Sequence, residues 1–164
     1  MLNLILPPEI SGTIKGALEK AGPREIGGVV LGEHTGADEF TVREITVHTP
    51  GAIASFVRLI QDALGRITSF FQNTKHDYRR FNYLGEWHSH PSFVPEPSDR
   101  DDASMWEIVQ DPKIGANFAA LLIAKLDGEG NLLASAHAYL PDGGKHRGTV
   151  TIKTQDVESS ARAS

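Results

Sequence analysis

The chain has 164 residues, 40 % of them hydrophobic and 23 % charged, which indicates one globular domain large enough to bury a substantial core. Its formal net charge of −5, from 16 basic and 21 acidic side chains, argues against a dedicated nucleic-acid-binding protein. The sequence has no cysteine, which excludes disulfides, cysteine nucleophiles and cysteine-bound zinc.

The N-terminal segment predicts a helix and no targeting signal. The opening sequence MLNLILPPEI has no basic region and only a short apolar run, so it is neither a signal peptide nor a membrane span. We therefore expect a cytoplasmic protein that does not bind membranes. Within residues 8–21, Ile10, Ile14 and Leu18 recur at helical spacing, and Gly22 then ends the helix.

Two strands are predicted next, at residues 25–34 (EIGGVVLGEH) and 38–48 (DEFTVREITVH). The glycine pair at 27–28 indicates a close backbone approach or a bulge. In the second strand the hydrophobic alternation changes phase halfway, which predicts a bulge near Arg43 and Glu44.

A long helix is predicted within residues 49–81 because this segment keeps one apolar face. That face consists of Phe56, Ile60, Ala63, Leu64, Ile67 and Phe71. The segment either shapes a substrate surface or is simply a longer helix.

The second half of the chain predicts further strands and one helix. In order, these are a strand at 82–90, a helix at 98–109, a hairpin of strands at 118–125 and 131–140, and a last strand at 149–153. Because helices and strands interleave without a repeat or a linker, we predict one mixed α/β domain over residues 1–153, with helices packed on a central sheet. The remaining residues, 154–164, are polar and are expected to be a disordered tail.

The stretch YLGEWHSHP places two histidines one residue apart in a predicted strand. Side chains at i and i+2 point to the same face of a strand, so His88 and His90 project together, while Trp87 and Ser89 face the other side. Two imidazoles on one face can hold a metal ion, although a bare H-x-H is more often a pair of surface histidines.

A capping signal follows this pair after seven intervening residues. Ser98 and Asp101 fit the S-x-x-D pattern of a capping box at a helix N-terminus. Asp101 also shares a helical stripe with Met105 and Ile108, so its carboxylate lies at the inward edge of the helix. An inward carboxylate needs a partner, and a metal held by the two histidines would serve.

Two histidines and one carboxylate, with water as the fourth ligand, form a standard open zinc site. Spacing alone does not choose between Asp101 and its neighbours Asp99 and Asp102. A hydrolytic site of this kind also needs a general base. Glu86 shares the strand face of the histidines and Glu25 lies at the start of the first buried strand, and spacing does not rank these two glutamates.

The segment HSHPSFVPEPSDRD matches H-x-H-x7-S-x2-D without a gap, and PREIGGVVLG upstream is similar to a strand that bears a glutamate. Together they resemble the JAMM metalloproteases, also called JAB or MPN+ domains, over residues 8–140. The resemblance implies the cytidine-deaminase-like fold of that family. It also implies cleavage of peptide or isopeptide bonds after the C-terminal tail of ubiquitin-like proteins.

The resemblance also implies a role for each residue of the signature. His88, His90 and Asp101 would be the Zn²⁺ ligands, and Glu25, rather than Glu86, would be the general base and acid. Ser98 would help to hold the oxyanion of the tetrahedral intermediate. No position of the signature is substituted, so the resemblance implies an active enzyme.

The tryptophan before the first histidine is similar to compact bacterial members, which occur beside activating-like and conjugating-like enzymes, including in antiphage operons. The resemblance therefore implies a ubiquitin-like substrate and operon-encoded partners. Two alternatives stay open: a metal-stabilised module that binds such a partner without cleaving it, and a peptidase that acts on a sulfur-carrier protein conjugate. Partner binding without turnover would favour the first alternative, and a neighbouring gene for a small protein with a Gly-Gly end would favour a peptidase.

Three further residues, Leu31, Val94 and Pro95, are candidates for the walls of the substrate groove. The remaining histidines are scattered and are expected to be surface or satisfied core residues: His34, His48, His76, His137 and His146.

Overall fold

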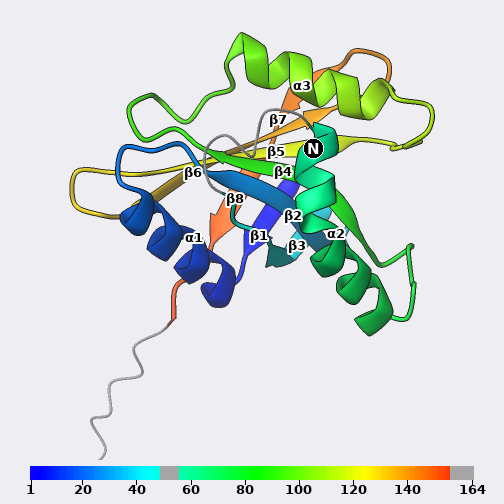
Figure 1. Ribbon diagram of the computed structural model, residues 1–164, viewed down its shortest axis with the longest axis horizontal. Helices are drawn as coiled ribbons and strands as arrows, with labels where there is room; N and C mark the ends of the chain where they lie inside the picture. The colour runs from blue at the N-terminus through cyan, green and yellow to red at the C-terminus, as the bar shows by residue number, and fades with distance from the viewer. Residues whose placement is uncertain (49–55, 156–164) are drawn as a thin grey trace, which may run out of the picture.

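The computed structural model describes residues 1–48 and 56–155 (Figure 1). The elements are β1 (Asn3–Leu6), α1 (Pro8–Ala21), β2 (Gly27–Gly36), β3 (Glu39–Ile45), α2 (Phe56–Asn73), β4 (Phe81–Ser89), α3 (Asp99–Gln110), β5 (Ala119–Leu126), β6 (Leu132–Tyr139), β7 (Lys145–Arg147) and β8 (Thr149–Ile152). This is the predicted mixed α/β domain, and most of the predicted tail lies outside the described residues. Among the described residues, no helix combines the length and apolarity needed to cross a membrane.

The eight strands of the described residues form one sheet with the order β7-β6-β5-β4-β2-β3-β1-β8. Although β7 and β8 are at opposite ends of this order, only Gly148 separates them in the chain. The Gly148 N–H donates to the carbonyl of Ala136 in β6 at 2.8 Å, and the Thr149 N–H donates to the carbonyl of Leu2 at 2.9 Å. The β7–β8 segment therefore joins the two edges, and the sheet curls around one of its faces.

Helix α1 fills the face around which the sheet curls. Its buried residues Ile10, Ile14 and Leu18 pack with Trp87 of β4 and with small side chains of β5 and β6. The small side chains are Ala120, Ala124, Ala136 and Ala138. Alanines at these positions leave room for the helix inside the curved sheet.

Helices α2 and α3 cover the opposite face, and α1 and α3 lie on either side of the sheet in Figure 1. Leu59 and Ala63 of α2 pack on Val29 and Leu31 of β2. Met105, Ile108 and Val109 of α3 pack on Ala119, Leu121 and Ile123 of β5. Strand β4 lies between β2 and β5, so its residues on this face, Glu86 and His88, lie between the two helix packing sites.

The predicted apolar face of the long helix is wrong at one position. Leu64 is 56 % exposed, whereas Leu59 and Phe70, which the prediction left out, are buried with Ala63. The contact stripe of α2 is therefore rotated from the predicted face, because the sheet selects one side of a broad apolar surface. The predicted residue Phe56 lies where side chains are not described.

The backbone irregularities predicted in the first strands are confirmed. Leu31 pairs with Glu44 and Gly32 pairs with Val42, so Arg43 is the extra residue of a bulge. A Cβ atom at Gly28 would lie 1.9 Å from the carbonyl oxygen of Thr46, which leaves no space for a side chain there.

Candidate active site

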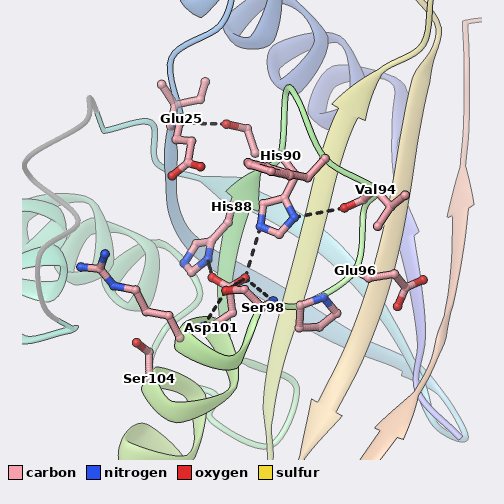
Figure 2. A pocket seen from close by; sticks show the side chains of 13 residues that line it. Glu25, His88, His90, Val94, Glu96, Ser98, Asp101 and Ser104 are labelled. Carbon is pink, nitrogen blue, oxygen red and sulfur yellow. Dashed lines mark hydrogen bonds and ion pairs between the residues drawn. The ribbon is translucent and has the colours of Figure 1, made fainter.

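A cavity of about 630 Å³ opens beside the C-terminal end of β4 (Figure 2). All five residues that the sequence analysis assigned to a zinc hydrolase site line it: Glu25, His88, His90, Ser98 and Asp101. They come from the α1–β2 connection, the end of β4 and the start of α3. The fold thus brings together residues that are more than 70 positions apart in the chain.

Strand β4 and the residue after it present the two histidines. Trp87 is fully buried on the α1 side, where its Nε1–H donates to the carbonyl of Thr46 at 2.8 Å. The alternation of the strand then directs His88 to the opposite face. His90 lies just past the strand, and its N–H donates to the carbonyl of Ala124 at 3.0 Å.

Glu25 precedes β2 and is held beside the histidine pair by its neighbour in the chain. The Ile26 N–H donates to Ser89 Oγ at 2.8 Å, and the Ser89 N–H donates to the Ile26 carbonyl at 2.8 Å. Ser89 is the residue between the two histidines, so this pair of bonds couples the position of Glu25 to theirs. The Glu25 side chain is exposed, and its carboxylate points into the cavity in Figure 2.

The predicted capping box at the start of α3 is confirmed. The Asp101 N–H donates to Ser98 Oγ at 3.2 Å, and the Ser98 N–H donates to Asp101 Oδ2 at 2.8 Å. The Ser98 hydroxyl also donates to Asp101 Oδ2 at 2.8 Å. The cap fixes the carboxylate of Asp101 at the inner edge of the helix, where it faces the histidines.

Asp101 is the aspartate that contacts both histidines. Its Oδ1 lies 2.9 Å from His88 Nδ1, and its Oδ2 lies 3.2 Å from His90 Nε2. Asp102 instead accepts a hydrogen bond from Tyr139 at 2.5 Å and pairs with Lys145 at 2.8 Å. Of the aspartates that spacing could not separate, the structure therefore places Asp101 in the cluster.

Glu86 contacts the other nitrogen of His88. Its Oε2 lies 2.8 Å from His88 Nε2, and the residue is only 3 % exposed. Glu86 is not one of the residues that line the cavity, whereas Glu25 is. Glu86 is thus placed to orient the His88 ring and Glu25 to meet a molecule in the cavity.

The charges of this cluster stabilise one another. Burial lowers the pKa of His88, but hydrogen bonds to Asp101 and Glu86, together with their charges, outweigh it and raise this pKa to about 9. Burial raises the pKa of Asp101, but hydrogen bonds from His88 and Ser98 hold it well below its usual range. At neutral pH, His88 is therefore a cation between two carboxylates.

Within residues 1–48 and 56–155, no group of three or more His, Cys, Asp or Glu side chains is already arranged to hold a metal ion. The cluster is an ion-paired arrangement in which the proton of His88 supplies the positive charge between the carboxylates. Its chemistry nevertheless fits zinc, because two imidazoles and a carboxylate converge at one cavity.

Of the three residues predicted to form the groove walls, one lines the cavity. Val94 lines the cavity, but Pro95 does not. Leu31 is fully buried beneath α2, so its assignment to the groove is wrong. Sequence reasoning did not detect the role of Ser89 in placing Glu25, because that contact joins segments 63 positions apart.

Comparisons with known proteins identify the family. A family model described as prokaryotic homologs of the JAB domain matches residues 12–137. The solution structure of protein DSY2949 from Desulfitobacterium hafniense has the same fold, with a TM-score of 0.63 at 18 % identity over 93 % of this chain and 94 % of that one. No curated protein sequence matches the chain significantly. Because the family match covers most of the chain and confirms the resemblance seen in the H-x-H-x7-S-x2-D segment, the chain belongs to the prokaryotic homologs of the JAB domain.

Proposed function

We propose that this chain is a zinc-dependent peptidase or isopeptidase that hydrolyses the bond after the C-terminal tail of a ubiquitin-like protein. One observation carries the proposal: His88, His90 and Asp101 meet at a cavity that Glu25 and Ser98 also line, within a JAB domain. The substrate is either a conjugate or a precursor with an extended C-terminus. The partners of this chain would include activating and conjugating enzymes encoded in the same operon. It would act with them in the bacterial cytoplasm.

His88, His90 and Asp101 would hold the zinc ion. When bound, zinc supplies Lewis-acid chemistry, since it polarises a carbonyl group and makes water more acidic. Glu86 would keep its hydrogen bond to His88 Nε2 and so leave Nδ1, which faces Asp101, as the nitrogen for the metal.

Glu25 and Ser98 would handle the substrate. The Glu25 carboxylate faces the cavity, where it can take a proton from the attacking water and pass it to the leaving amine. The Ser98 hydroxyl, which donates to Asp101, can turn to donate to the developing oxyanion of the scissile carbonyl. The backbone part of the helix cap, from the Ser98 N–H to Asp101, is preserved in that movement.

The proposal predicts a single cut that depends on a metal. The purified protein is incubated with a ubiquitin-like protein from its own gene neighbourhood, extended beyond the C-terminal glycine, and the product masses are read. We expect one cleavage after that glycine, loss of cleavage with a zinc chelator, and recovery when zinc is added back. Cleavage that persists after complete removal of the metal would contradict the proposed chemistry.

A metal-stabilised module that binds a ubiquitin-like partner without cleaving it is the second candidate. It is supported by the family match, which is to the JAB domain and not to a catalytic activity. Under this alternative, the same incubation would give a stable complex and an intact substrate.

Zinc uptake is expected to strengthen with rising pH. Because the pKa of His88 is about 9 in the ion-paired cluster, binding at neutral pH must displace one proton from the ring. The apparent affinity should then rise about tenfold per pH unit between about pH 6 and pH 8. Competition with a chromogenic chelator measures this slope, and calorimetry in two buffers with different ionisation enthalpies counts the proton. A zinc affinity that does not change with pH would refute the displacement of a proton from His88 by zinc.

A further inference from the structure

The 91–97 loop (PSFVPEP) joins the two halves of the candidate site, because it leads from His90 to Ser98. Side chains of β5 and β6 donate hydrogen bonds to the backbone of this loop. Lys125 Nζ donates to the carbonyl of Phe93 at 2.9 Å, and the Ser135 hydroxyl donates to the carbonyl of Pro95 through a short hydrogen bond. The backbone of the loop is thus held by two side chains outside the H-x-H-x7-S-x2-D segment.

His137 supports Ser135 from the next position on the same face of β6. Its Nε2 lies 3.2 Å from Ser135 Oγ. The single hydroxyl proton of Ser135 is used on Pro95, and a carbonyl cannot donate, so His137 Nε2–H must donate to Ser135. The result is a directed chain of hydrogen bonds from His137 to Ser135 and on to the loop.

Glu96 lies beside this chain. Its carboxylate lies 3.6 Å from His137 Nε2, too far for a hydrogen bond, and pairs with Arg147 of β7. Its N–H donates to the carbonyl of Val94 at 2.8 Å. Val94 is therefore linked to Glu96, whose neighbour Pro95 is held by Ser135 and whose carboxylate pairs with Arg147.

The carbonyl of Val94 in turn orients His90. It lies 3.2 Å from His90 Nδ1 (Figure 2), and His90 Nε2 faces Asp101 at 3.2 Å. Because a carbonyl only accepts, this contact favours a proton on Nδ1, while the Asp101 carboxylate, which also only accepts, favours one on Nε2. The loop thus supplies a hydrogen-bond acceptor to one ring nitrogen of His90, as Glu86 does to one ring nitrogen of His88.

We propose that Ser135 and His137 are positioning residues for His90, acting through the 91–97 loop and the Val94 carbonyl. The inference rests on the proposed function in one respect, namely that His90 is a zinc ligand. Both residues are almost fully buried, at 5 % and 3 % exposed, opposite the apolar Ile123 and Leu121 of β5. Burying polar side chains among apolar neighbours is costly unless their hydrogen bonds are satisfied, and here the loop satisfies them.

The first test compares Ser135→Ala with Ser11→Ala. Ser11 is a matched control, because it is a serine 7 % exposed whose hydroxyl donates to the Lys153 carbonyl at 2.8 Å, and it does not line the cavity. We expect zinc affinity, measured by chelator competition, to fall about tenfold in Ser135→Ala and to stay unchanged in Ser11→Ala, at a similar loss of Tm. Ser135→Thr keeps the hydroxyl donor and is expected to restore the affinity. Equal zinc affinity in the two alanine variants would overturn the inference.

The second test needs no metal and separates this inference from the proposed function. Nitrogen-15 NMR of the imidazole rings in the metal-free protein at high pH reports which nitrogen of His90 carries the proton. We expect the Nδ1-protonated fraction, which the Val94 carbonyl stabilises against the Asp101 carboxylate at Nε2, to be the same in the unmutated protein and in Ser11→Ala, and to fall in Ser135→Ala. An unchanged ring in Ser135→Ala would overturn the positioning role even if zinc binding itself were demonstrated. Should Ser135→Ala not fold, Glu96→Ala instead removes the contacts of the loop with His137 and Arg147, at a residue whose side chain is 41 % exposed.

Discussion

Replacing Glu25 by alanine is expected to slow cleavage by about 10²- to 10⁴-fold and to leave zinc affinity within twofold of the unmutated protein. The reason is geometric, because Glu25 lines the cavity without contacting His88, His90 or Asp101 in the ion-paired cluster. Initial rates on the extended ubiquitin-like substrate measure the first effect, and chelator competition measures the second.

Two further variants make this experiment decisive. Glu19→Ala removes another exposed glutamate, from α1, and should leave the cleavage rate unchanged. Glu86→Ala removes the other glutamate that the sequence offered as the base. Because Glu86 is buried against His88, we expect its loss to weaken zinc binding by about 10- to 100-fold. Activity that survives Glu25→Ala but disappears in Glu86→Ala with zinc still bound would instead make Glu86 the base.

The candidate site was predictable from the sequence because its spacing rules are local. Alternation along a strand places His88 and Glu86 on one face, and helical periodicity turns Asp101 inward with Met105. The structure shows both placements. The Ser89–Ile26 bonds and the Ser135 contact with the loop were not predictable, because they join segments 63 and 40 positions apart.

The fold was predictable where an element carries its own pattern and less so where distant pairing creates it. Helix α1 ends just before its C-cap residue Gly22, and helix α3 begins just after its N-cap residue Ser98, as the sequence predicted. Strands β1 and β7, with four and three residues, were missed, although the pattern TVTIK predicted the equally short β8. They exist through their pairing with β3, β6 and β8, and this pairing closes the curled sheet.

Asp101 belongs both to the N-terminal cap of α3 and to the histidine cluster, so it couples the helix to the histidines. Its Oδ2 accepts from Ser98, while both of its oxygens face imidazole nitrogens. In the metal-free protein, the lowered pKa of Asp101 means that its stabilising contribution is present above the ordinary carboxyl range. That contribution is lost as the pH falls below this range.

Asp101→Asn and Ser98→Ala are expected to separate these two roles. The asparagine still offers one oxygen to the Ser98 N–H, so α3 should persist. Zinc affinity should nevertheless fall by more than about 100-fold, since losing a ligand costs more than losing the partner of a ligand. Ser98→Ala removes the cap at a cost of about 1 kcal/mol, measured by denaturant unfolding of the metal-free protein, and should change zinc affinity by less than about tenfold. Asp99→Asn, in the same exposed first turn, is the matched control and should change neither quantity. If Asp101→Asn bound zinc as tightly as Asp99→Asn, Asp101 would be a helix cap alone, and the proposed ligand set would be wrong.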